Sequence, residues 1–184
     1  MSSATALCCT LSPEEIEFLA ENMKIEIVPL ETMDQLPLIS CTIPVMKPPR
    51  KLKIPLWLAL KLKTQGRARI VPPEWLNVAT LEQLRNEEIE QDAFAPLPFH
   101  WLEVAQMLLR DCADDMEDVE QIQRLLLELR EARQNKARKG LEAVNEVQLG
   151  VDNLGAMEIN EIRPFFTQIM NRMQKVVQAS KEGE

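Results

Sequence analysis

Residues 118–140 read DVEQIQRLLLELREARQNKARKG, and this stretch favours a mainly helical fold. Its apolar residues recur at intervals of three, four and three, at Val119, Ile122, Leu126 and Leu129. That spacing places them on one face of an α-helix. Acidic residues just before the stretch suit the positive end of a helix dipole. The sequence therefore predicts a helix that begins near Asp114 or Asp118 and runs beyond Arg138.

The second half of this helix is basic. Residues 130–139 hold five bases and one acid, Glu131, before apolar residues resume at Leu141. Charged side chains of one sign favour solvent over a packed core. Gly140 costs about 1 kcal/mol relative to Ala inside a helix, so it indicates a bend or the close approach of another backbone. We expect this part of the helix to project past the core.

Further helices are predicted on both sides of this one. An earlier apolar stripe at helical spacing consists of Trp101, Val104, Ala105, Leu108 and Cys112. Before that stripe, Thr80 with Gln83 gives a capping-box pattern that opens a helix to about Gln91. Residues 153–155 predict a turn into a last helix, with Pro164 in its first turn. The apolar stripe of that last helix consists of Phe166, Ile169, Met170, Met173 and Val177.

The part of the chain before residue 72 has a different pattern. Residues 12–15, Ser-Pro-Glu-Glu, combine an N-cap Ser, a Pro at the first helical position and a Glu three residues on, which predicts a short helix to about Asn22. Residues 24–28 alternate like a half-buried strand, and residues 69–71 read as another strand. Residues 11–71 therefore form one small mixed α/β module.

One segment of this module stays ambiguous. Leucines at every second position in residues 56–63 suit a strand. Pro55 before them and Gly66 after them suit a short helix instead. Periodicity alone leaves both structures open.

Length and composition limit the class of protein. The 184 residues allow one domain, or one small module joined to a larger one. Apolar residues make up 46% and charged residues 27%, which is ordinary globular usage. No apolar run approaches the ~18 residues that a membrane span needs, and no secretion signal begins the chain, so we expect a soluble, unsecreted protein that makes no membrane contact.

Charge is sorted into blocks along the chain. The net charge is −8, which argues against coating of nucleic acid by bulk attraction. Residues 35–73 nevertheless hold no acid and eight bases: Lys47, Arg50, Lys51, Lys53, Lys61, Lys63, Arg67 and Arg69. These bases are candidates for contact with phosphates or with a protein partner. A solvated face is the competing interpretation, because leucines alternate with the bases and Trp57 is the only nearby aromatic residue.

The residue patterns of catalysis and cofactor binding are missing from the sequence. His100 is the only histidine, and its aromatic neighbours favour a structural role. No glycine-rich phosphate loop or nucleophile elbow occurs. The four cysteines include no C-x-x-C pair, and the acids at 114–118 lack the spacing of a calcium loop. We expect no catalytic residue, no cofactor and no metal site, and a reducing compartment.

Seven blocks along the chain resemble one known family. They are the Ser12–Glu21 segment, PLWLA at 55–59, PPEWL at 72–76, LPFHW at 97–101, REAR at 130–133, KGL at 139–141 and EINEIRPFF at 158–166. In this order and spacing they closely resemble the partner of Sld-five family, the second subunit of the eukaryotic GINS complex. The resemblance covers nearly the whole chain.

The resemblance implies a fold and a division into domains. The fold is mainly α with a small α/β part, in which a β-rich domain precedes a helical bundle. The implied boundaries are a flexible N-terminus at 1–10, the β-rich domain at 11–72, the helical domain at 73–178 and a tail at 179–184. It also favours a short helix for the ambiguous residues 56–63.

The resemblance further implies a nuclear, non-catalytic role. Proteins of this family assemble with three other GINS subunits as a heterotetramer. The tetramer joins the Cdc-forty-five protein and the minichromosome-maintenance hexamer in the replicative helicase (CMG), which serves initiation of DNA replication and fork progression. DNA would be met through the assembled helicase. The alternative from the residues alone is direct nucleic-acid binding by residues 47–69.

Subunit contacts are expected on the long helix and the last helix. The candidate residues are Leu125, Leu126, Leu129, Arg133, Arg163, Phe165 and Phe166. Their alternative role is in the core of this chain, because helical stripes look alike whichever partner covers them.

Overall fold

The structure is a computed structural model that describes residues 10–39, 42–142 and 152–182. The predicted flexible N-terminus lies outside the described residues, except for Thr10. Residues 143–151, which follow the basic helix, also lie outside them. Among the described residues, no helix combines the length and the apolar character needed to cross a membrane.

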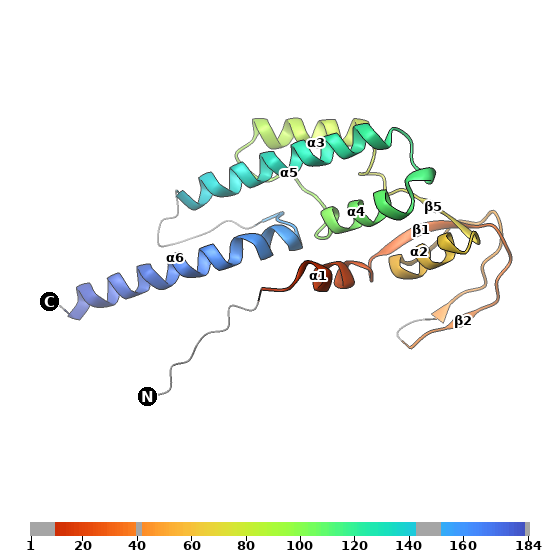
Figure 1. The fold of residues 1–184 in the computed structure, drawn as a ribbon, viewed down its shortest axis with the longest axis horizontal. Helices are drawn as coiled ribbons and strands as arrows, with labels where there is room; N and C mark the ends of the chain where they lie inside the picture. Colours follow the sequence, from red (N-terminus) through yellow and green to blue (C-terminus); the bar gives the residue numbers. More distant parts are fainter. Residues whose placement is uncertain (1–9, 40–41, 143–151, 183–184) are drawn as a thin grey trace.

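A small antiparallel sheet forms the first part of the chain (Figure 1). Its central strand, β1, pairs with β4 on one side and with β5 on the other. The predicted alternation is confirmed, because Ile25 and Ile27 are buried while Glu26 and Val28 are only half-buried. A separate hairpin joins β2 to β3. The strands are β1 (Lys24–Pro29), β2 (Leu36–Pro37), β3 (Thr42–Ile43), β4 (Leu52–Pro55) and β5 (Ala68–Val71).

Two short helices accompany the sheet. α1 (Pro13–Ala20) begins with the predicted capping box, in which the Ser12 hydroxyl accepts from the Glu15 N–H and the Glu15 carboxylate accepts from the Ser12 N–H. α2 (Leu56–Thr64) shows that the ambiguous leucine run is a helix. Pro55 ends β4, and contact with the sheet buries Leu56, Leu58, Ala59 and Leu62 on the new helix.

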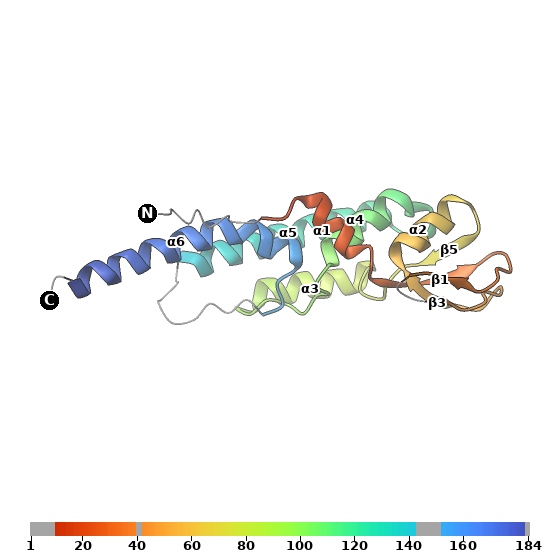
Figure 2. The same cartoon turned by 90° about the horizontal axis from the view of Figure 1, so that it is seen from below.

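The rest of the chain is helical (Figures 1 and 2). α5 is the long predicted helix, and α3 packs along it. The predicted stripe of α4 is confirmed, because all five of its residues are buried. The elements are α3 (Val78–Glu90), α4 (Trp101–Asp111), the 3₁₀ helix η1 (Ala113–Asp115), α5 (Val119–Glu142) and α6 (Ala156–Glu182). The chain is therefore mainly α with a small sheet first, as predicted.

Two local predictions were wrong. The N-cap of α3 is Asn77, whose side chain accepts from the Thr80 N–H at 2.8 Å, so Thr80 lies inside the helix. Pro164 lies in the interior of α6 and not in its first turn, because α6 begins at Ala156. The C-terminal tail from residue 179 stays a prediction, and α6 includes its residues as far as Glu182.

One continuous cluster of buried apolar side chains joins the sheet to the helices. The Asp115 carboxylate strengthens this junction, because it accepts from the Ile70 N–H of β5 at 2.9 Å and pairs with Lys63 of α2 at 2.7 Å. The molecule is elongated. The end of α6 lies at one extreme and the β2–β3 hairpin at the other (Figures 1 and 2).

Candidate subunit-docking site

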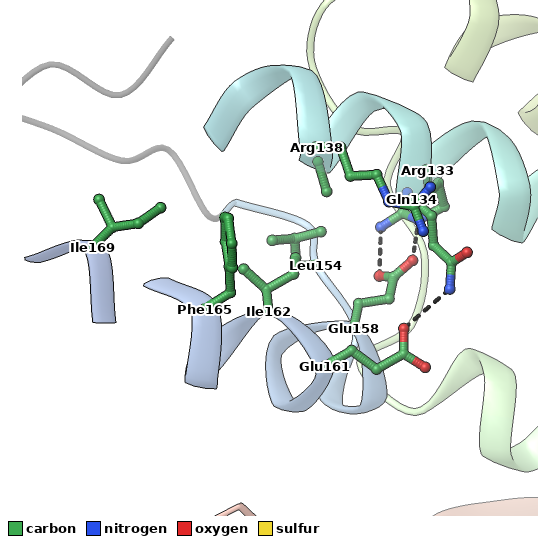
Figure 3. Close-up of a pocket in the computed structure, with 10 residues that line it drawn as sticks. Arg133, Gln134, Arg138, Leu154, Glu158, Glu161, Ile162, Phe165 and Ile169 are labelled. Carbon is green, nitrogen blue, oxygen red and sulfur yellow. Dashed lines mark hydrogen bonds and ion pairs between the residues drawn. The ribbon is translucent and has the colours of Figure 1, made fainter. Parts of the chain in front are cut away.

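An open apolar groove lies between α5 and α6 (Figure 3). Its volume is about 590 Å³. Apolar side chains dominate it, and charged side chains stand along one side. The residues that line it are Arg133, Gln134, Ala137, Arg138, Leu154, Glu158, Glu161, Ile162, Phe165 and Ile169. Such a surface suits an apolar element of another protein, since a soluble chain rarely leaves a contiguous apolar patch uncovered without a function.

α6 supplies most of the apolar surface. Ile162, Phe165 and Ile169 follow one another at intervals of three and four, so they stand in a row along one face of the helix. Phe165 is 55% exposed, which is high for so large an apolar side chain. An amphipathic helix with the same spacing could place its own apolar row between α5 and α6.

A buried cluster of charges lies beneath the groove, centred on Arg133 of α5. The Arg133 guanidinium donates to both oxygens of Glu158, at 2.7 and 3.0 Å, and to Glu88 at 2.9 Å. It also donates to the carbonyl oxygens of Ala95 and Asn153. The Arg133 side chain is fully buried, so all of its hydrogen-bonding capacity must be met inside the protein. The planar guanidinium meets it with five contacts.

The two carboxylates of this cluster also hold backbone. Glu158 accepts from the Gly155 N–H at 2.7 Å, which closes the first turn of α6. Glu88 accepts from the Ala95 N–H at 2.9 Å and pairs with Lys136 at 2.6 Å. A Cβ on Gly155 would lie 3.0 Å from the Trp101 ring and 3.2 Å from the Phe99 carbonyl oxygen, so any other residue here requires these neighbours to shift by a few tenths of an ångström. The cluster therefore joins α3, the connection after it, α5 and the start of α6.

The rim of the groove carries exposed polar pairs. Glu161 of α6 pairs with Arg130 at 2.7 Å and accepts from Gln134 at 3.1 Å. Arg138 has no ion-pair partner among the described residues. These pairs bridge α5 and α6 at one end of the groove and leave the other end open.

Two family models match the chain in succession. The PSF2 N-terminal domain matches residues 12–71, and the GINS complex protein helical bundle domain matches residues 75–177. The chain belongs to the PSF2 family. The predicted resemblance is confirmed, and neither matched description names a catalytic activity.

Curated relatives of the PSF2 family match along nearly the whole chain. The chain is 65% identical over 173 residues to the DNA replication complex GINS protein psf2 of Schizosaccharomyces pombe, covering 94% of each sequence. It is 43% identical over 169 residues to the PSF2 protein of Debaryomyces hansenii, covering 91% of this chain and 82% of the relative. The chain is 33% identical over 166 residues to the human PSF2 protein, covering 88% of this chain and 90% of the relative.

The structure separates the predicted contact residues of this PSF2-family chain into two groups. Leu125, Leu126, Leu129 and Arg133 are buried inside the chain, as their alternative role in its core requires, and contact with another subunit stays a prediction for them. The expectation that residues 130–139 project past the core was wrong for Arg133, because Glu88 and Glu158 neutralise it there. Arg163, Phe165 and Phe166 lie on α6 and remain candidates.

Sequence reasoning missed part of the groove. Gln134, Ala137 and Ile162 line it but were not predicted contacts. The signal for Ile162 was available, because it stands three residues before Phe165 and seven before Ile169. The signal for Gln134 and Ala137 was absent, since their role depends on where α6 crosses α5.

The predicted basic residues are also separated by the structure. Four of them pair with carboxylates of this chain: Lys53 with Glu26, Lys63 with Asp114 and Asp115, Arg67 with Glu31, and Arg69 with Asp115. Lys47, Arg50, Lys51 and Lys61 have no such partner in the described part of the chain. The eight bases are therefore not one free surface.

His100 has a structural setting. Its Nδ1 atom lies 3.9 Å from the buried Glu103 carboxylate, at the start of α4. Burial raises the pKa of Glu103 above its ordinary value, although the Met157 N–H and His100 oppose this shift. No group of three or more potential metal ligands occurs among the described residues.

Proposed function

We propose that this chain is a non-catalytic subunit of a heterotetrameric GINS complex, and that the α5–α6 groove receives an apolar helix of another subunit. The observation that carries the proposal is the row of exposed Phe165 and half-buried Ile162 and Ile169 along the groove, in a chain of the PSF2 family. Burying such a row gives the apolar core that stable subunit interfaces have, and the Glu161 pairs provide a polar rim.

The assembled complex would act in the nucleus. There it would join the Cdc-forty-five protein and the minichromosome-maintenance hexamer in the CMG helicase, for initiation of DNA replication and fork progression. This chain would contribute fixed geometry to that machine, and the motor subunits would hydrolyse ATP. The names of the relatives, which are DNA replication complex GINS proteins, support this assignment.

Co-expression with the three other GINS subunits tests the proposal. The wild-type chain should give a 1:1:1:1 complex by light scattering, and the complex should survive high salt because its interfaces are apolar. The double variant Phe165→Asp/Ile169→Asp should lose at least one subunit. Ile89→Asp is a matched control, because Ile89 is 68% exposed on α3 and does not line the groove.

The outcomes separate docking from folding. If circular dichroism shows native helix content in the double variant while subunits are lost, the groove is an interface. A double variant that assembles like the Ile89→Asp control would contradict the proposal that the groove is a subunit interface. A wild-type chain that ignores the three subunits would contradict the assembly role itself.

A further inference from the structure

A turn at the far end of the molecule presents bases that this chain leaves uncommitted. Residues 47–51, here named the basic turn, connect β3 to β4, and Lys47, Arg50 and Lys51 are all exposed. The Arg50 N–H donates to the Lys47 carbonyl at 2.9 Å, which closes the turn. Two prolines, at 48 and 49, restrict its backbone. The three cations are therefore displayed on a backbone with little freedom to lose on binding.

The neighbouring bases show that the basic turn is unusual. Lys53 and Arg67, from the same module, pair with Glu26 and Glu31 at 3.5 and 3.3 Å. By contrast, no carboxylate among the described residues pairs with the basic turn. The three bases of the turn thus have no ion-pair partner in the described part of the chain, although the chain as a whole carries a charge of −8.

Apolar side chains flank the basic turn. Val45, two residues before it, is 48% exposed, and Leu36 on the β2–β3 hairpin is 40% exposed. Residues 30–53 include no aromatic side chain on which a base could stack. Cations next to aliphatic side chains are complementary to carboxylates next to aliphatic side chains. This composition favours an acidic polypeptide over nucleic acid.

The position of the basic turn allows it to act together with the groove. The turn and the hairpin lie at the end of the molecule opposite to the end of α6 (Figures 1 and 2). A subunit held at the α5–α6 groove would leave this end available. The inference that the basic turn and the groove act together rests on the proposed function, because it assumes that the chain is held in an assembly.

We propose that the basic turn, with Val45 and Leu36, is a docking site for an acidic polypeptide segment that carries aliphatic side chains. Lys47, Arg50 and Lys51 pair with its carboxylates, and its aliphatic residues cover Val45 and Leu36. One chain would then join two partners, one at each end.

Fluorescence anisotropy on the co-expressed complex tests this site with three labelled probes: a peptide of Glu-Glu-Leu repeats, a Glu-Glu-Ser peptide of equal charge and length, and an oligo-dT strand. The variant is Lys47→Glu/Arg50→Glu/Lys51→Glu. The matched control is Lys24→Glu/Arg124→Glu/Lys139→Glu, which makes the same charge change at exposed residues elsewhere. The basic-turn variant should weaken Glu-Glu-Leu binding by about tenfold or more, since like charges would then face each other.

Further results decide the chemistry of the partner. Val45→Ser should weaken binding of the Glu-Glu-Leu peptide but not of the Glu-Glu-Ser peptide. Equal weakening by the basic-turn variant and its control would overturn the proposal, because it would show only a net-charge effect. Tighter binding of oligo-dT than of the peptide, lost in the basic-turn variant, would overturn it in favour of nucleic acid. The mass of the complex, measured on the same samples, separates any of these results from a failure to assemble.

Discussion

Replacing Arg133 by Met would remove the cation from the buried cluster and keep a side chain of similar length. Glu158 would lose both of its contacts to the guanidinium and would retain the Gly155 N–H. Glu88 would keep Lys136 and the Ala95 N–H. The substitution therefore leaves one buried carboxylate without a counter-charge and one with a partner.

The expected loss of stability follows from that geometry. Removing one partner of a buried ion pair typically costs about 3 to 5 kcal/mol, because the remaining charge stays buried and uncompensated. For a chain of this size each kcal/mol shifts the melting temperature by roughly 2 to 4 °C. Arg133→Met should therefore lower the melting temperature by about 6 to 20 °C. Arg133→Lys keeps the charge but loses the planar guanidinium. Its melting temperature should therefore lie between those of the wild type and Arg133→Met.

Thermal unfolding of the chain purified with its co-expressed partners measures this effect. Arg124→Met is the matched control, since Arg124 also lies on α5 but pairs with Glu128 at the surface. That control should cost less than about 1 kcal/mol. Adding Glu158→Gln to Arg133→Met should recover part of the loss, because it removes the unpaired charge. A loss from Arg133→Met as small as that of the control would refute the reasoning.

Three more outcomes are expected. Asp115→Ala should lower the free energy of unfolding by about 1 to 3 kcal/mol, because the Ile70 amide would lose its acceptor. Hydrogen exchange at that amide should become faster. Unchanged exchange would contradict the role of Asp115 in joining the sheet to the helices. Because burial raises the pKa of Glu103, its contribution to stability is fully present below the ordinary carboxyl pKa and is lost as the pH rises through the raised value. Glu103→Gln should therefore melt higher than wild type at neutral pH, with a gap that closes on acidification; a gap that is independent of pH would contradict this. Burial raises the pKa of Cys112 to about 12, so peptide mass spectrometry should find it unalkylated by iodoacetamide at pH 8 until the chain unfolds.

Local signals predicted much of the fold. The capping box at Ser12 and the stripe around Trp101 depend on residues within a few turns of each other, and the structure has both. The prediction that Thr80 caps α3 was wrong, although the cap is also a local feature. Asn77, three residues earlier, is the N-cap of the same helix. Periodicity also could not decide between strand and helix for residues 56–63, since contact with a sheet decides it.

The candidate site was harder to predict because it depends on distant pairs. Arg133 looked like a surface base within a basic run. Its partners Glu88 and Glu158 stand 45 and 25 residues away in the sequence, so nothing near Arg133 shows that its charge is neutralised. The spacing of Ile162, Phe165 and Ile169 on α6 could have been read from the sequence, but the wall of the groove opposite them appears only when α5 and α6 are placed together.

Burial of Arg133 and openness of the groove are connected features. Arg133 and Glu158 belong to the charge cluster and also line the groove, so the contact that begins α6 fixes its distance from α5 at that end. Further along, Phe165 and Ile169 stand along the groove beyond this contact (Figure 3). α6 is thus fixed at its start and carries apolar side chains along the groove beyond that point. This arrangement suits an interface formed with little rearrangement, because the geometry is set before the partner binds. Loosening the cluster should therefore weaken subunit binding, because the start of α6 would no longer be fixed against α5.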